Sequence, residues 1–390
     1  MTPMDAPALY NLSPLAEVLL TGLLLACGPL FWVWLRHRRS SPVGRRQALT
    51  LVTLFLTFDL VLFGAFTRLT DSGLGCPDWP GCYGQASPIG AQVQIAAAHQ
   101  DMPTGPVSHG KAWVEMVHRY LATAVGGLIV VGLVWSVALR WRHGLNRAEA
   151  GDGVLWPALT LVWVCLQGAF GALTVTMKLF PAIVTLHLAG GVVLLLLLGL
   201  QVQRQSTARG AVELPRAWRR LLLAGALLLA LQILLGGWVS TNYAVLACSS
   251  FPTCQGQWWP DMNFAQGFEL WRPLGLQAQG EPISFAALTA IHYVHRLVAG
   301  AVFLVLGCLA WRLSAVERLR RLAAWLAALL GLQLLTGLSN VVLGWPLVAA
   351  LAHTGGAAGL ALVMGCLVAA SRASPGGSSS VSVSASRFSA

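Results

Sequence analysis

Residues 115–119 read Glu-Met-Val-His-Arg, and residues 292–296 repeat the pattern as His-Tyr-Val-His-Arg. Each copy begins a long apolar run directly after a polar loop that contains two cysteines. Residues i and i+3 share one face of a helix, so the first and fourth side chains of each copy point the same way. Ionisable side chains at membrane depth are costly and mark functional sites, and a neutral imidazole is an axial ligand of haem iron. The duplication favours this functional interpretation over two hydrogen-bonded core histidines.

The composition indicates a polytopic membrane protein. Of the 390 residues, 56% are hydrophobic and only 10% are charged, which is far more apolar than a soluble domain. Nine apolar runs each approach the ~20 residues that cross a bilayer. The predicted spans are about 16–35, 47–67, 113–139, 154–176, 183–203, 219–241, 286–311, 321–343 and 347–370.

The net charge of +11 reflects membrane topology and not a nucleic-acid partner. Arginines gather in short connections near residues 36–46, 140–147, 204–220 and 312–321, and such connections stay in the cytoplasm. The two cysteine loops, about 68–112 and 242–285, then face the opposite, oxidising side. We therefore expect a multi-pass protein of the bacterial inner membrane with its cysteine loops in the periplasm.

An internal repeat divides most of the chain into two halves of four spans each. In each half a glycine lies twelve residues before the first loop cysteine, and a late histidine lies twenty residues after a glutamine. These landmarks are Gly64, Cys76, Gln167 and His187, and then Gly236, Cys248, Gln333 and His353. Both halves begin on the same side of the membrane, so the repeats are parallel and related by an axis along the membrane normal.

The predicted fold is all-α, with two tandem four-helix bundles related by a pseudo-twofold axis and one extra N-terminal helix. The predicted units are 1–46 for the extra helix and its basic loop, 47–203 for the first half, 204–370 for the second half, and 371–390 for a tail. The tail is rich in serine and has no apolar period, which predicts disorder.

Four histidines form the candidate cofactor sites. His118 and His187 lie at similar depth in the second and fourth spans of the first half, as do His295 and His353 in the second half. Two imidazoles at equal depth in a four-helix bundle can hold one haem. Glycines follow His187 and His353, which indicates either close approach of a flat macrocycle or close helix packing.

The loop cysteines are predicted to form two disulfides, Cys76–Cys82 and Cys248–Cys254. Zinc is the competing interpretation, but the spacing is loose for a structural zinc site and no histidine follows at the usual short interval. Paired cysteines on an oxidising face form disulfides.

The halves differ where the first has Glu115 and the second has His292. A pair of electron-transferring haems does not require a carboxylate beside one iron. A carboxylate in a dry pocket moves protons or stabilises positive charge that develops on a substrate. This difference predicts a catalytic role for Glu115, and the alternative is an ion pair with Arg119.

These features resemble the haem A synthase family over about residues 47–370. The resemblance rests on the loop signature FTRLTDSGLGCPDWPGCYG at 66–84, the Glu-x-x-His-Arg pattern at 115–119, and the later histidines. It implies that the protein converts haem O to haem A, for cytochrome oxidase, by oxidising a ring methyl group to a formyl group with the help of a b-type haem. Many members have eight spans, so the extra first helix departs from the family pattern.

The resemblance also implies a role for each site residue. His118 and His187 would hold the substrate haem with Glu115 as the catalytic carboxylate, and His295 and His353 would hold haem b. The guanidinium fork suits carboxylates, so Arg68, Arg119 and Arg296 are expected to bind the haem propionates.

Two other classes remain open at this stage: a dihaem b-type electron carrier, such as a quinol-oxidising cytochrome subunit, and a non-catalytic haem-binding assembly factor. The Glu115/His292 difference favours the enzyme. The expected partners are haem O delivered by haem O synthase, an electron donor that the sequence does not name, and membrane lipid. A homo-oligomer is left open.

Overall fold

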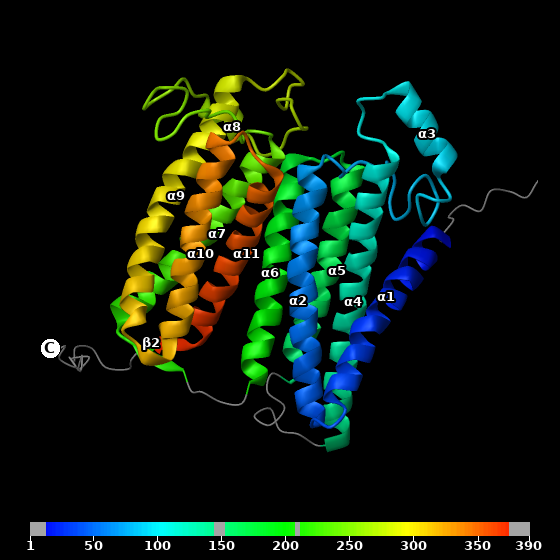
Figure 1. Ribbon diagram of the computed structural model, residues 1–390, viewed down its shortest axis with the longest axis vertical. Coiled ribbons are helices and arrows are strands. Elements are labelled where there is room, and N and C mark those ends of the chain that lie inside the picture. Colours follow the sequence, from blue (N-terminus) through cyan, green and yellow to red (C-terminus); the bar gives the residue numbers. More distant parts are fainter. Residues whose placement is uncertain (1–12, 144–152, 207–210, 374–390) are drawn as a thin grey trace, which may run out of the picture.

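The computed structural model describes residues 13–143, 153–206 and 211–373 as an almost entirely helical protein (Figure 1). In these ranges nine helices are long and apolar enough to cross a membrane. They are α1 (Ser13–His37), α2 (Pro42–Leu69), α4 (His109–His143), α5 (Leu155–Thr176), α6 (Pro181–Gln205), α7 (Arg216–Thr241), α9 (Phe285–Ser314), α10 (Arg320–Val342) and α11 (Leu347–Ala369). All nine predicted spans are confirmed.

In the same ranges five shorter elements lie between the spans or after the last one. They are α3 (Gln92–Asp101), α8 (Phe264–Gly267), the 3-10 turn η1 (Glu317–Leu319), and the strands β1 (Val212–Leu214) and β2 (Ser371–Ala373). Figure 1 shows α3 and α8 at the same end of the molecule, where the two cysteine loops lie. This common end agrees with the expectation of parallel repeats.

Local sequence sets the helix boundaries. The hydroxyl of Ser41 accepts a hydrogen bond from Gly44 N (3.1 Å) at the start of α2, and the hydroxyl of Ser284 accepts one from Ala287 N (3.2 Å) at the start of α9. Such caps satisfy backbone donors that a helix leaves unpaired. Proline at the first position also begins α2 and α6, where its missing N–H costs nothing.

The repeat extends to the backbone conformation. Tight turns with positive φ join α5 to α6 at 178–179 and α10 to α11 at 344–345, which are corresponding positions of the two halves. Each cysteine loop also has a positive-φ residue directly after its second cysteine, Tyr83 (φ 51°) or Gln255 (φ 55°), followed by a positive-φ glycine. The two halves therefore share loop geometry as well as helix order.

Eight of the nine spans form two four-helix bundles that stand side by side (Figure 1). In the first, α2, α4, α5 and α6 pack in a ring in that order, and in the second α7, α9, α10 and α11 do the same. α4 and α6 are thus diagonal to each other, as are α9 and α11. The predicted bundle architecture is confirmed.

The bundles meet through reciprocal contacts of α6 and α11. Gly199 on α6 faces Leu362 on α11, and Gly365 on α11 faces Leu196 on α6. In the repeat Gly199 corresponds to Gly365, and Leu196 corresponds to Leu362. Reciprocal contacts of this kind are the mark of a twofold relation, so they support the predicted pseudo-twofold axis.

The extra helix α1 packs on the outer side of the first bundle, mainly against α4. Gly22 lies against Thr123 with no space for a Cβ. Val18, which is 4% exposed, joins a buried cluster with both cysteines of the first loop. α1 therefore supports the first cysteine loop as well as the bundle beneath it.

The start of the tail differs from the sequence prediction. Ser371–Ala373 form a parallel pair with Val212–Leu214, and Arg372 forms an ion pair with Glu213 at 2.7 Å. The prediction of disorder from Ser371 is wrong for these three residues, because the backbone leaving α11 meets the extended segment that enters α7. The rest of the predicted disordered tail, 374–390, lies outside the described residues.

Candidate functional site

Each predicted histidine lies against a glycine of a neighbouring helix. A Cβ added to Gly64 on α2 would lie 3.0 Å from His118 Nε2, and one added to Gly236 on α7 would lie 3.1 Å from His295 Cε1. These distances are shorter than almost all real Cβ contacts. The imidazole edges therefore rest on backbone that only glycine leaves open.

The late histidines repeat the arrangement on the other two helices of each bundle. A Cβ on Gly171 of α5 would lie 3.4 Å from His187 Cε1, and one on Gly337 of α10 would lie 3.2 Å from His353 Cε1. Four histidine–glycine contacts thus occur at corresponding positions of the two halves.

The structure brings each predicted histidine pair together across a bundle. His118 on α4 and His187 on α6 stand on diagonal helices and are close enough for their charges to interact, and the same holds for His295 on α9 and His353 on α11. Both pairs lie in the half of the molecule nearer the cysteine loops, because all four helices begin at that end (Figure 1).

The donor set of each pair suits an iron porphyrin. Among the described residues no group of three or more His, Cys, Asp or Glu side chains is arranged to hold a bare metal ion. Two opposed imidazoles instead suit an ion whose other ligands come from a macrocycle. His187 Nδ1 is also buried and has no hydrogen-bond partner in the described part of the chain. The residues present therefore fit a haem in each bundle.

The glycines after the late histidines serve helix packing. Gly190 faces the Gln167 amide and Gly356 faces the Gln333 amide, and neither position has space for a Cβ. Gly355 lies against Leu62 of the other half, where a Cβ would come within 2.8 Å. Of the two interpretations of these glycines, close packing is the one that the contacts support. The glycines that face the imidazoles were missed, although Gly64 and Gly236 already stood out as repeat landmarks.

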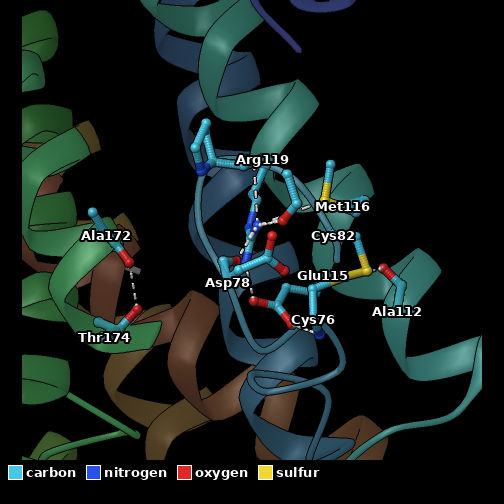
Figure 2. Close-up of polar contacts among 12 residues, drawn as sticks. Cys76, Asp78, Cys82, Ala112, Glu115, Met116, Arg119, Ala172 and Thr174 are labelled. Atoms are coloured by element: carbon cyan, nitrogen blue, oxygen red, sulfur yellow. Dashed lines mark hydrogen bonds and ion pairs between the residues drawn. A yellow bond between two sulfur atoms is a disulfide. The ribbon is translucent and has the colours of Figure 1, made fainter. Parts of the chain in front are cut away.

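Glu115 joins α4 to the first cysteine loop (Figure 2). Its Oε2 accepts a hydrogen bond from the backbone N–H of Cys76 at 2.8 Å, and its Oε1 forms an ion pair with Arg119. The residue is only 4% exposed. The ion pair considered from the sequence is therefore present, and the carboxylate is also a backbone anchor for the loop.

Arg119 extends this anchor into the loop (Figure 2). Its guanidinium donates to three loop carbonyls, those of Asp78, Pro80 and Gly81. An arginine shared among several acceptors in a water-poor place is held firmly. Arg119 thus fixes the loop over the first bundle.

The second half builds the same anchor with a side chain that carries no negative charge. The N–H of Cys248 donates to His292 Nδ1 at 3.3 Å, and Arg296 Nε lies 3.2 Å from His292 Nε2. Arg296 also donates to loop carbonyls, those of Cys248 (2.7 Å), Ser250 (2.7 Å) and Thr253 (3.2 Å). Glu115 and His292 therefore occupy one structural role and differ in charge.

Loop carbonyls are partners of both guanidiniums in the described structure, and the binding of haem propionates by Arg119 and Arg296 stays a prediction. Arg68 makes a third kind of contact. It donates to the carbonyl of Ser240 in the other half at 2.6 Å and stacks over the ring of Tyr243. The sequence could not reveal such partners, since a backbone carbonyl has no residue-specific signature.

Tyr243 completes a link between the two halves. Burial raises the pKa of its phenol above the ordinary value, and the nearby Arg68 opposes this shift. The protonated phenol donates to Asp71 Oδ1 at 2.7 Å, and Asp71 also pairs with Arg68 at 3.3 Å. The loop ends of α2 and α7 are therefore held together.

Both predicted disulfides are present. Cys76–Cys82 and Cys248–Cys254 have Cα separations of 4.8 and 4.6 Å, within the range that such bonds need. In each loop the second cysteine also pairs through its backbone with the residue three positions later. Each disulfide thus closes a small turn directly above an anchored helix.

Comparison with known proteins agrees with this geometry. The sequence model of the cytochrome oxidase assembly protein family matches residues 47–365. The haem A synthase of Shewanella oneidensis is 36% identical over 316 residues, which are 80% of this chain and 92% of that protein. Those of Halalkalibacterium halodurans and Caulobacter vibrioides are 26% and 27% identical over 81% and 85% of this chain and 92% and 96% of their own lengths.

The matched region contains all four histidines and both disulfides, and it begins after α1. A match of this extent is far larger than a shared motif. The chain therefore belongs to the haem A synthase family of membrane oxidoreductases, within the cytochrome oxidase assembly proteins.

Proposed function

We propose that this protein converts haem O to haem A by oxidising a ring methyl group to a formyl group, and so supplies haem A for cytochrome oxidase. One observation carries the proposal. In each half two diagonal imidazoles, each against a glycine, lie beneath a disulfide-closed loop, in a chain of this family.

We assign the substrate haem to His118 and His187 and a resident b-type haem to His295 and His353. The bound haem b would supply one-electron redox chemistry. The assignment is supported by Glu115, since the first half alone has a carboxylate at the anchor position. The imidazoles of the first half hold and orient the substrate, and the loop above them limits the access of water.

Glu115 is the proposed catalytic carboxylate. The second half anchors its loop with the imidazole of His292, so anchoring alone does not require a negative charge. Oxidation of a methyl group builds positive character at the carbon, and a fixed carboxylate in a low-dielectric site stabilises such charge better than water does. The same carboxylate can accept a proton that the methyl carbon loses. Arg119 would act as a positioning residue by holding Oε1.

The dihaem electron carrier is the alternative proposal. Both histidine pairs lie toward the same end of the molecule (Figure 1), whereas transfer of electrons across a membrane is served by haems near opposite faces. The geometry therefore supports the enzyme.

Haem identity and location test the proposal together. The full-length protein is produced in cells that make haem O, purified, and its extracted haems are identified by mass. We expect haem b and haem A in the wild type, haem b but no haem A in His118→Ala and His187→Ala, and loss of haem b in His295→Ala and His353→Ala. Haem b alone in the wild type would favour the electron carrier, and equal loss of haem b from all four variants would overturn the division between the halves.

A further inference from the structure

The two halves differ in what holds their late histidines. In the second half, Thr336 Oγ1 lies 3.0 Å from His353 Nδ1. The same hydroxyl donates its proton to the carbonyl of Leu332 at 2.7 Å, one turn earlier on α10. A hydroxyl has a single proton to donate, so at His353 the hydroxyl oxygen is the acceptor and Nδ1–H is the donor.

This contact selects one tautomer of His353. A neutral imidazole has one protonated nitrogen and one with a free lone pair, and the hydrogen bond of the first decides the state of the second. With the proton on Nδ1, the lone pair is on Nε2, which is the form that binds iron. His353 is therefore prepared for ligation before any haem arrives.

The first half lacks this device. Gly171 on α5 and Gly337 on α10 both face a late histidine, so these two glycines are corresponding positions of the repeat. The residue before each glycine is Phe170 in the first half and Thr336 in the second. A phenyl ring has no oxygen or nitrogen atom to accept the proton of Nδ1, and His187 Nδ1 is one of the buried atoms without a hydrogen-bond partner among the described residues.

The early histidines also differ in their neighbours. Gln232, four residues before Gly236, places its amide nitrogen 3.1 Å from His295 Nδ1 and 3.2 Å from the His295 carbonyl. The corresponding residue four positions before Gly64 is Leu60, which has no polar group. The amide nitrogen of Gln232 is a donor, so it contacts His295 without selecting the tautomer that Thr336 selects at His353, and the inference therefore rests on Thr336.

We propose that Thr336 is a positioning residue that makes the second haem site a retentive one, and that the apolar residues at the matched positions leave the first site exchangeable. The proposal rests on the proposed function, in which the first site must release its product and the second must keep its haem. A partner on the far nitrogen of a ligating histidine orients the ring and strengthens it as a donor, and its loss typically costs 10- to 100-fold in affinity for the metal group.

The test uses full-length protein with its haem b bound. Thr336→Val keeps the shape and removes the hydroxyl, whereas Thr336→Ser keeps the hydroxyl. Transfer of haem b to an excess of a haem-scavenging protein gives the rate of loss, and a redox titration of the bound haem b gives its midpoint potential. We expect Thr336→Val to lose haem b at least about tenfold faster than the wild type, and its midpoint potential to rise because a weaker donor stabilises ferric iron less. Thr336→Ser should behave like the wild type.

A reciprocal variant tests the first half. Phe170→Thr places a hydroxyl at the matched position beside His187, so more haem O or haem A should remain with the purified protein while haem b is unchanged.

The midpoint potential separates a structural effect of Thr336→Val from a loss of the hydrogen bond. Because Val is isosteric with Thr, a purely structural effect of this variant would lower protein yield and leave the midpoint potential of the remaining haem unaltered.

Three results would overturn the proposal. One is a wild-type rate of haem loss and midpoint potential in Thr336→Val, and another is equal loss from the Val and Ser variants. If haem b depends on His295 and His353, either of these two results refutes the role of Thr336 and leaves the proposed function standing. The third, a wild-type protein whose haem b does not depend on those histidines, removes the proposed function and this inference together.

Discussion

The carboxylate of Glu115 holds the first cysteine loop, and the imidazole of His292 holds the second cysteine loop in the same way. Both side chains receive the N–H of the first loop cysteine, and both contact the arginine one turn later. The shared contacts explain why each position needs an acceptor. They do not explain why the first half has a negative charge there, and this charge is the property of Glu115 that the proposed reaction would use.

Glu115→His gives the first half the anchor of the second and removes the charge. We expect this variant to keep the Cys76–Cys82 disulfide and haem b while haem A formation falls by about 10²- to 10³-fold, the usual cost of losing an electrostatic stabiliser. Extracted pigments and non-reduced peptide masses measure both. The control is His292→Gln, which changes the other anchor and should leave haem A formation largely intact. Wild-type haem A in Glu115→His would mean that anchoring is the whole role of the carboxylate.

At the scale of the helix, the glycines opposite the imidazoles allow a sharp test. Gly337→Ala on α10 adds a Cβ 3.2 Å from the ring of His353, so we expect displaced ligation and loss of haem b. Gly64→Ala presses on His118 instead and should abolish haem A formation while haem b remains. Absorption spectra of the purified variants separate these outcomes.

A matched control lies on the same helix as Gly337. At Gly331 a Cβ would meet no described atom within 4 Å. Gly331→Ala should therefore keep haem b and gain up to about 1 kcal/mol from better helix propensity. If Gly331→Ala lost haem b as readily as Gly337→Ala, the glycines would matter for helix formation and not for space beside the ring.

Farther from the cysteine loops than the histidine pairs, the two bundles differ in polarity. A small cavity between α2, α4, α5 and α6 is lined in part by Thr50, Thr160 and Gln201. At the corresponding positions the second half has Leu222, Leu326 and Leu367, all within its largest buried apolar cluster. Gln201 Nε2 donates to Thr160 Oγ1 at 2.5 Å, and both residues are buried.

A double-mutant cycle measures this pair. Thr160→Leu alone leaves a buried amide without its partner, and we expect a loss of about 1–3 kcal/mol in the free energy of unfolding. Thr160→Leu with Gln201→Leu restores the apolar pair of the second half and should recover most of that loss. Unfolding of the purified protein in mixed micelles gives the energies. A double variant as unstable as the sum of the single variants would show that the pair is not coupled.

For the whole molecule, hydropathy and repeated spacing predicted the nine spans, the bundle pairing and both disulfides. These features depend on runs of apolar residues and on intervals within one segment, which a sequence displays directly. The histidine pairs were also predicted, because diagonal positions follow from the repeat of four spans.

What could not be predicted depends on which helices face each other and in what rotation. The glycine beneath each imidazole, the Thr336 hydroxyl beside His353 and the carbonyls around Arg119 come from separate segments. The strand pair of Ser371–Ala373 with Val212–Leu214 joins residues about 160 positions apart by backbone atoms alone. No local pattern marks such contacts.

The orientation of the molecule in the membrane is the remaining prediction at this scale. Both cysteine loops lie at one end (Figure 1), and the helix ends at the other carry basic residues such as Arg36, Arg204 and Arg312. Because short connections rich in arginine stay in the cytoplasm, we expect the loops in the periplasm, where their disulfides can form. A periplasm-active reporter inserted after Ser87 should be active and one fused to the C-terminus inactive, with the reverse for a cytoplasm-active reporter. Equal activity at both positions would contradict the odd number of spans, and the reversed pattern would place the disulfides on the reducing side and refute the orientation.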